Sequence, residues 1–223
     1  VYSNQGDYSK ALVCFEGALK IFLLLNGDNH PAVATSYSYI GQIYFAQNDY
    51  SKALDYFKKS LKLDLSFFGE NHPSVASGYY NIGYVYFAQG DYSKALEYFE
   101  EVLKIRLSVY GENHSQVSSI YDHIGEIYFA QKDYSKALYY FEESLKIRLS
   151  LFGENHPEVA LSYYSIGSLY IIQGDKSKAL NYYEKSLKIR LSVYGENHPL
   201  TKEIMDLINV ANSKVLQSPE TTK

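Results

Sequence analysis

Five histidines recur along this chain at a constant interval of 42 residues, and each follows an asparagine: His30, His72, His114, His156 and His198. Imidazole is a common metal ligand, so a regular series of this kind raises the question of a metal site. If each interval is one packed helical pair, successive rings lie about 10 Å or more apart, too far for shared coordination. Four of the five precede a proline. The pattern therefore predicts loop histidines that hydrogen-bond within the loop or cap a helix, and no metal site.

A sixth histidine, His123, lies outside the series and has Asp122 and Glu126 within one helical turn. Three polar side chains on one turn could bind the hydrogen-bond donors of a peptide. A metal ion is the weaker alternative.

The single cysteine, Cys14, lies in an apolar stretch and is predicted to be a small core residue. With no second cysteine the chain forms no internal disulfide, which favours a reducing, cytoplasmic location. The sequence contains no glycine-rich phosphate loop and no nucleophile elbow. We therefore predict that the protein is not an enzyme and uses no cofactor.

A six-residue motif keeps the same interval as the histidines. Asp-Tyr-Ser-Lys-Ala-Leu begins at Asp7, Asp49, Asp91 and Asp133, and the variant Asp-Lys-Ser-Lys-Ala-Leu begins at Asp175. A period of this length that persists along a chain predicts a stack of near-identical supersecondary units. Such a stack offers a long repeated surface, which commonly binds a partner.

Composition narrows the classes of partner. The net charge is only -4, which gives no reason to expect nucleic acid or an anionic membrane surface as a ligand. No apolar run reaches the length of a membrane span, and we expect no signal peptide before the first repeat. Hydrophobic residues make up 46% of the chain, which is ample material for a helical core.

One unit, residues 31–69, shows how each repeat should fold. Pro31 suits the first turn of a helix, and apolar residues then recur at steps of three and four up to about Gln47. A second helix is predicted from Tyr50 to Phe68, ended by a glycine in a left-handed conformation. Gly41 lies inside the first helix, where glycine costs about 1 kcal/mol relative to alanine, so we expect a neighbouring helix to approach it closely.

This unit resembles the tetratricopeptide repeat. The resemblance is carried, in order, by Tyr37, Ile40, Gly41, Tyr44, Ala53, Phe57 and Ser60. The common repeat has about 34 residues, whereas this one has 42 and contains the connection Gly-Glu-Asn-His-Pro, features that are similar to the kinesin light chain subclass. The resemblance implies an all-α fold, a right-handed α-solenoid of stacked antiparallel helix pairs.

The repeat also sets the expected domain organisation, a single array over residues 1–216. Residues 1–30 form a partial first repeat, because Val1 aligns with Ile43 one period on. Full repeats cover 31–72, 73–114, 115–156 and 157–198, and their first helices start at Pro31, Pro73, Ser115 and Pro157. Residues 199–216 are predicted to be a capping helix with a polar outer face, and 217–223 a frayed tail.

In the resembled family the first helices line the concave face, which implies where a partner would bind. The predicted peptide-binding residues are Tyr39, Gln42, Phe45, Tyr80, Asn81, Tyr84, Phe87, Asp122, His123, Glu126, Phe129, Tyr164 and Ser168. The recurring phenylalanines form either an aromatic ladder facing the groove or a packed seam between adjacent first helices. Asn81 matches the asparagine that holds a cargo peptide backbone in kinesin light chains, while Tyr39, His123 and Ser165 take its place in the other repeats.

The sequence thus predicts a protein-interaction scaffold that binds a peptide segment of a partner protein in its groove. One alternative is an architectural spacer that makes its contacts through its outer face, near Lys58, Lys62 or Glu101. The charges of that face, Asp64 among them, are predicted to be solvated. The other is a regulatory array within a larger enzyme or signalling protein. We expect a monomer, and near-identical hairpins leave a swapped dimer open.

Overall fold

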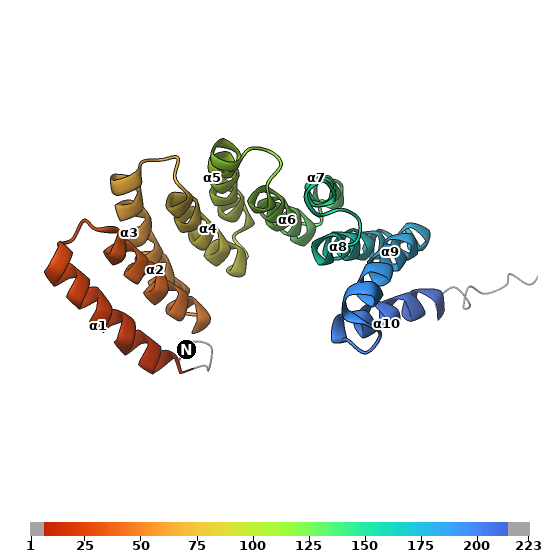
Figure 1. Ribbon diagram of the computed structural model, residues 1–223, viewed down its shortest axis with the longest axis horizontal. Helices are drawn as coiled ribbons and strands as arrows, with labels where there is room; N and C mark the ends of the chain where they lie inside the picture. Colours follow the sequence, from red (N-terminus) through yellow and green to blue (C-terminus); the bar gives the residue numbers. More distant parts are fainter. Residues whose placement is uncertain (1–6, 214–223) are drawn as a thin grey trace, which may run out of the picture. The chain divides into compact units, whose positions relative to one another are not determined.

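The computed structural model describes residues 7–213, and within that range every regular element is an α-helix (Figure 1). The helices are α1 (Tyr8–Asn26), α2 (Pro31–Ala46), α3 (Tyr50–Phe68), α4 (Pro73–Ala88), α5 (Tyr92–Tyr110), α6 (Ser115–Ala130), α7 (Tyr134–Phe152), α8 (Pro157–Gln173), α9 (Lys176–Tyr194) and α10 (Pro199–Ser213). The predicted starts of the four first helices are confirmed. The partial helix expected before Asp7, the last three residues of the predicted capping helix (214–216) and the predicted tail (217–223) lie outside the described residues.

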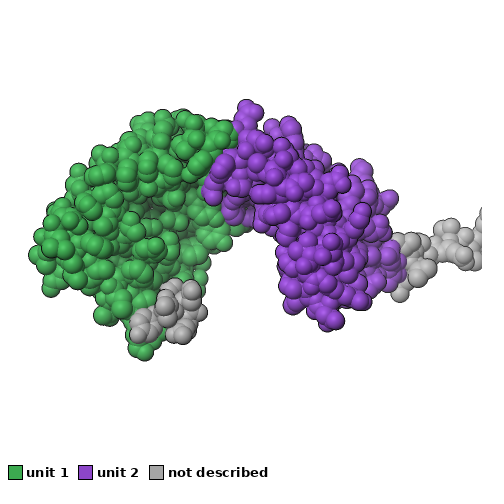
Figure 2. Space-filling model, in the orientation of Figure 1, with its two compact units in different colours: residues 1–111 green, residues 112–223 purple. Residues whose placement is uncertain are grey.

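The chain divides into two compact units, residues 1–111 and residues 112–223 (Figure 2). Unit 1 contains α1 to α5, and unit 2 contains α6 to α10. Within each unit every helix packs against the helix before it and the helix after it in the chain. Each unit is therefore a stack of helical hairpins, as the repeat predicts, while one continuous array over residues 1–216 stays a prediction.

Inside each hairpin the two helices are held close by a glycine that meets an aromatic ring. A Cβ added to Gly41 would lie 2.7 Å from the Phe57 ring, and one added to Gly125 would lie 2.7 Å from Phe141. Both phenylalanines are buried. The prediction that this glycine permits close packing is confirmed, and the approaching helix is the second helix of the same pair.

The repeated motif, Asp-Tyr-Ser-Lys or in α9 its variant Asp-Lys-Ser-Lys, starts each second helix and fastens it to the first. In the second repeat the Asp49 carboxylate accepts the backbone N–H of Lys52 at 3.1 Å, which caps the N-terminus of α3. The Lys52 ammonium lies 3.0 Å from Asp49 and 4.9 Å from the centre of the Tyr44 ring. Hydrogen bonds with Lys52 hold the pKa of Asp49 below its ordinary value. Because α1, α5, α7 and α9 begin in the same way, the motif is explained by helix capping.

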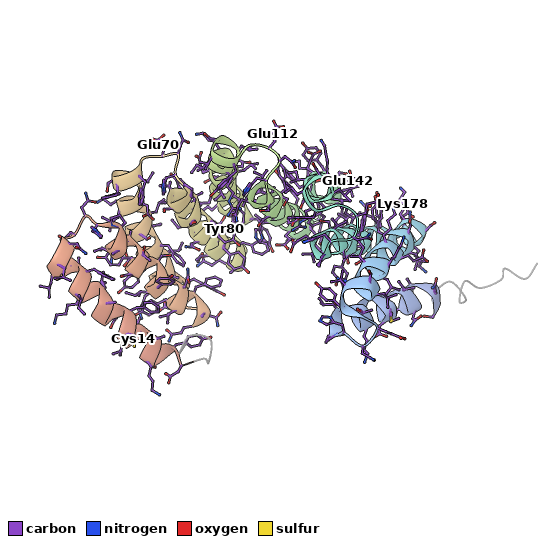
Figure 3. All side chains as sticks on the ribbon, in the orientation of Figure 1. Cys14, Glu70, Tyr80, Glu112, Glu142 and Lys178 are labelled. Atoms are coloured by element: carbon purple, nitrogen blue, oxygen red, sulfur yellow. The ribbon has the colours of Figure 1, made fainter. Side chains whose placement is uncertain are left out.

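The second helices end at a glycine whose backbone conformation is unfavourable for other residues. Gly69 has φ 75° and ψ -179°, and its N–H donates to the carbonyl of Leu65. The positive φ agrees with the expectation, but the extended ψ places Gly69 outside the left-handed helical region. The connection to the next repeat, which includes Glu70, leaves from this point (Figure 3).

No helix between residues 7 and 213 is both long enough and apolar enough to cross a lipid bilayer.

Candidate functional site

The recurring histidines cap the first helices. The Nδ1 atom of His72 accepts the backbone N–H of Ser74 at 3.1 Å, and the ring stacks on Phe68 with centroids 4.0 Å apart. His156 makes the same pair of contacts with Glu158 and Phe152. The predicted role in the loop is confirmed: the ring satisfies a free N–H at the start of the helix and fixes the preceding helix against it.

Cys14 is exposed, which corrects its predicted place in the core. The equivalent residues of the next two repeats are Tyr56 and Tyr98, and each stacks on a tyrosine of its own first helix. The Cys14 thiol is instead exposed on α1 (Figure 3).

Three of the predicted binding residues in unit 1 are exposed on the first helices α2 and α4, namely Tyr39, Gln42 and Tyr84. The exposed fraction is 45% for Tyr39 and 37% for Tyr84. Tyr39 is held in place by Phe15 of α1, whose ring stacks on it at a centroid distance of 4.9 Å. These tyrosines thus present large ring surfaces to solvent while one side of Tyr39 is fixed by packing.

The phenylalanines Phe45 and Phe87 are half-buried beside this surface. The ring of Phe45 lies 5.4 Å from Tyr84 and 5.6 Å from Tyr50. Phe87 lies 6.2 Å from Tyr84 and 6.0 Å from Tyr92. Phe45 thus meets the adjacent first helix α4, as the alternative interpretation held, whereas Phe87 meets Tyr84 of its own helix and Tyr92 of α5. Only part of each ring is available to a ligand.

The other two predicted residues of α4, Tyr80 and Asn81, are also half-buried. Tyr80 projects from α4 (Figure 3), stacks on Tyr84 at 6.0 Å, and has the Arg106 guanidinium 5.7 Å from its ring centre. Asn81 donates from Nδ2 to the hydroxyl of Ser38 at 3.3 Å, which joins α4 to α2. Asn81 is thus engaged within unit 1.

In unit 2, Asp122 pairs with an arginine inside the protein. Its carboxylate lies 2.7 Å from Arg148 of α7, a side chain that also pairs with Glu158 at 2.9 Å and donates to the Ser162 hydroxyl at 2.7 Å. Arg148 is only 5% exposed. Burial raises the pKa of Asp122, and the charge of Arg148 acts in the opposite direction. This carboxylate therefore belongs to an internal ion network.

Because Asp122 is used in that network, it does not join His123 and Glu126 in one site. The Nδ1 atom of His123 lies 3.3 Å from Oε2 of Glu126. Among residues 7–213, no group of three or more His, Cys, Asp or Glu side chains could hold a metal ion. Phe129 is half-buried, with its ring 5.9 Å from Tyr134.

The remaining predicted residues, Tyr164 and Ser168 of α8, are hydrogen-bonded within unit 2. The Tyr164 hydroxyl donates to Glu203 at 3.3 Å, and the Arg190 guanidinium lies 5.0 Å from its ring centre. Ser168 donates to the carbonyl of Tyr164 at 2.9 Å and accepts from the Tyr183 hydroxyl at 3.2 Å. The predicted residues of unit 2 are thus more fully engaged than the exposed tyrosines of unit 1.

A pocket of about 300 Å³ opens beside Tyr39 and Gln42 in unit 1. It is lined by Thr35, Ser38, Tyr39, Gln42, Ser60, Asp64, Ser74, Ser77 and Gly78. The one charged side chain among them is Asp64 of α3, which is 8% exposed. Burial raises the pKa of Asp64 to about 6, and nearby His72 acts in the opposite direction.

Sequence reasoning misplaced Asp64, because it assigned the residue to the solvated outer face. Lys58, Lys62 and Asp55 do lie exposed on α3, but Asp64 turns inward toward α2 and α4. The signal was present in the repeat. At the positions one and two intervals later stand Arg106 and Arg148, so Asp64 departs from the repeat in the sign of its charge.

These features define a class of protein, a repeat scaffold built of stacked helical hairpins. A sequence profile of the tetratricopeptide repeat matches residues 1–66, 60–108, 74–150 and 116–192. The chain therefore belongs to the tetratricopeptide repeat family, whose arrays are generally non-catalytic protein-interaction scaffolds. No curated protein matches the sequence.

Solved structures support the fold and the kinesin light chain-like form of the repeat. BtubC (BKLC) from P. vanneervenii is 25% identical with a TM-score of 0.78, over 89% of this chain and 78% of that one. A kinesin light chain-like protein from Podosopora anserina with nearly identical repeats is 19% identical, with a TM-score of 0.74 over 86% and 92%. The apo form of RapI is 20% identical, with a TM-score of 0.69 over 82% and 64%.

Proposed function

We propose that unit 1 binds a peptide segment of a partner protein on the face formed by the first helices α2 and α4. The main observation in support is a row of neighbouring aromatic side chains that extends from α2 to α4. Phe45 of α2 lies 5.4 Å from Tyr84 of α4, which in turn lies 6.2 Å from Phe87. Tyr39 extends the same face toward α1.

The chemistry of this face suits a peptide. Tyrosine provides a large contact area with few rotatable bonds, so little conformational entropy is lost on binding. Gln42 offers both a donor and an acceptor to a peptide backbone. Tyr39 and Gln42 also border the pocket that contains Asp64, so a bound segment would meet a polar cavity beside the aromatic surface. Exposed aromatic surface next to a polar cavity is typical of interaction hot spots.

In unit 2 the predicted contacts on the first helices are His123, Glu126 and Phe129 of α6, together with Tyr164 and Ser168 of α8. They contribute less in this proposal, because most of them already have partners inside the protein. Replacing them should therefore change partner affinity less than replacing Tyr84.

The proposal is tested by panning the protein against a random peptide display library and measuring the Kd of the enriched peptides by fluorescence polarisation. Tyr84→Ala should weaken these peptides by about tenfold or more, as expected for an interface anchor. Phe67→Ala is the matched control, because Phe67 is also an exposed aromatic residue of unit 1 but lies on the second helix α3.

Thermal unfolding of each variant, followed by circular dichroism, separates lost binding from lost structure. A folded Tyr84→Ala variant with unchanged peptide affinity would contradict the proposal. So would a library that yields no enriched peptide with the folded parent protein.

A second candidate is an architectural spacer that contacts partners through its outer face. One observation favours it: a shallow hollow of about 520 Å³ between α3, α4 and α5, bordered by Lys58, Lys62, Leu65, Tyr79 and Tyr98. A partner that still binds after Tyr84→Ala but is lost after a Lys58→Glu/Lys62→Glu double substitution would favour this function. A regulatory array within a larger protein is compatible with either face.

A further inference from the structure

The pocket in unit 1 contains a carboxylate, Asp64, at a repeat position where the three later repeats have an arginine. Residues 64, 106, 148 and 190 occupy one position of the 42-residue repeat, on the inward side of the second helix. Three of them are arginines, Arg106, Arg148 and Arg190, whereas the residue in the first full repeat is Asp64; the partial repeat before it has Phe22 at this position. The same position in the fold therefore carries opposite charges in different repeats.

In unit 2 the arginine at this position is bound from several sides. Arg148 contacts Asp122 of its own first helix at 2.7 Å and Glu158 of the next first helix at 2.9 Å. Arg190 donates to the carbonyl of Leu200 at 2.6 Å. The position thus lies where a second helix meets two first helices, and in unit 2 a cation from the chain fills it.

Around Asp64 the pattern of charges is inverted, and the partners are missing. Ser38 stands where Asp122 stands in unit 2, and Ser74 stands where Glu158 stands. A carboxylate replaces the arginine, and two small hydroxyl side chains replace the two acids. The side chains are shorter on all three helices, and the result is the pocket of about 300 Å³.

The Asp64 carboxylate is nine-tenths buried and lines this pocket, yet no hydrogen bond or ion pair joins it to any other residue between 7 and 213. A buried carboxylate without a partner is costly, and proteins normally pair it. Its raised pKa agrees with this lack of a partner. None of the other pocket-lining residues is a lysine, an arginine or a histidine.

We propose that this pocket binds the guanidinium group of an arginine side chain from a partner protein, with Asp64 as its counter-ion. The bound arginine would take the place that Arg148 takes in unit 2, but it would arrive from outside the chain. A guanidinium group fits because its planar, forked donors match a carboxylate and can also reach neighbouring oxygens.

Those neighbouring oxygens are available as acceptors. The Thr35 hydroxyl donates to the carbonyl of Pro31, and the Ser77 hydroxyl donates to that of Pro73, so both hydroxyls keep lone pairs for further donors. The amide oxygen of Gln42 is a third acceptor at the same pocket. One carboxylate surrounded by neutral oxygens suits a single organic cation.

This inference deepens the proposed function and rests on it, because Tyr39 and Gln42 line both the aromatic face and the pocket. It predicts that peptides bound by unit 1 carry an arginine. It also makes a prediction for a probe that needs no peptide, since an isolated arginine side chain should enter the pocket by itself.

The experiment titrates the protein with N-acetylarginine methylamide and follows backbone amide signals of α2, α3 and α4 by NMR. N-acetyllysine methylamide tests an ammonium group, and N-acetylnorleucine methylamide tests the carbon chain alone. We expect saturable shifts at the pocket with arginine, weaker ones with lysine and none with norleucine. Asp64→Asn should weaken the arginine probe by about tenfold or more, since it removes the counter-ion and keeps the shape.

The matched control is Asp55→Asn, because Asp55 is an exposed aspartate of the same helix that pairs with Lys59 at the surface. It should leave the titration unchanged. A second variant, Ser38→Asp/Asp64→Arg, copies the Asp122–Arg148 pair of unit 2 into the pocket. It should fold normally by circular dichroism and give no shifts with any probe, because the site is filled from within.

The outcomes separate this inference from the proposed function. Equal binding of the arginine probe to the parent and to Asp64→Asn overturns the inference, as does equal binding of arginine and norleucine. If library peptides then still bind in a Tyr84-dependent way, the proposed function stands alone. If the arginine probe binds through Asp64 but no peptide does, the inference holds and the peptide-binding face is the part that fails.

Discussion

Asp64 in unit 1 and Arg148 in unit 2 occupy the same position of the repeat, yet one lines an open pocket and the other is enclosed. Arg148 is joined to Asp122, Glu158 and Ser162 at 2.7–2.9 Å. Asp64 has no such partners among the described residues and borders a cavity. The comparison shows that the same backbone position in two repeats can either line a pocket or form a buried ion pair. The side chains opposite decide whether it closes the core or leaves room for a ligand.

The strongest test of the closed site is Arg148→Ala. The change leaves Asp122 buried without its counter-ion and should lower the free energy of unfolding by about 3–5 kcal/mol. Urea denaturation followed by circular dichroism measures it. Lys146→Ala is the control, because Lys146 lies exposed on the same helix, and its loss should be near neutral.

A loss below about 1 kcal/mol for Arg148→Ala would mean that the network is solvated and contributes as little as a surface pair. The contrast between closed and open sites would then rest on shape alone and no longer on charge.

At the Asp64 pocket, a substitution is expected to raise the free energy of unfolding and not to lower it. Asp64→Asn should raise the free energy of unfolding at pH 7.5 by about 1–3 kcal/mol, because it removes a buried charge that lacks a partner. The pKa of Asp64 is about 6 in the folded protein, against an ordinary value of 3.8. The folded state therefore binds the proton more tightly, and the parent gains stability as the pH falls from about 6 to below 4.

The advantage of the Asp64→Asn variant over the parent should accordingly shrink over that pH range. His72 is the side chain that acts electrostatically on Asp64, and Tyr39 also borders the pocket, so Asp64→Asn is best measured alongside His72→Gln. A gain from Asp64→Asn that is constant between pH 4 and 7.5 would exclude a titrating carboxylate as its cause. A binding site that costs stability when empty is expected to behave as predicted here.

Some of the features compared here can be predicted from the sequence, and others cannot. Helix starts at Pro31 and Ser115, the histidine caps and the tight packing at Gly41 follow from local rules of spacing and backbone conformation, and all are confirmed. Asp64 does not follow from such rules. Its helix is lined with exposed lysines, and only contacts with two other helices show that it points inward.

The candidate binding face could be predicted from the sequence only in part. The repeat places Tyr39 and Tyr84 on first helices, and both are exposed. It gives no means to foresee that Asp122 pairs with Arg148, because the two residues come from different helices and are separated by more than a helical turn in sequence. The repeat pattern therefore does not predict side-chain contacts that form between helices in the folded protein.

A smaller effect is expected at the histidine caps, which both units share. His156→Ala removes the acceptor for the Glu158 N–H and the ring that stacks on Phe152, so it should cost about 1 kcal/mol. His156→Asn keeps an acceptor for the helix N-terminus and should recover part of that loss. Thermal unfolding compares the two variants, and equal destabilisation by both would assign the effect to ring stacking alone.

The smallest effect belongs to Cys14, where unit 1 again departs from the repeat. Its counterparts Tyr56 and Tyr98 are anchored by stacking on a first-helix tyrosine, whereas Cys14 is exposed on α1. Cys14→Ser should therefore change the free energy of unfolding by no more than about 0.5 kcal/mol, as is usual for surface sites. The native thiol should also react with a thiol reagent at the rate seen in urea, since no unfolding step is needed. A native rate that is slower by orders of magnitude would place Cys14 in the core, as its apolar sequence neighbours suggested, and would mean that another segment covers this side of α1.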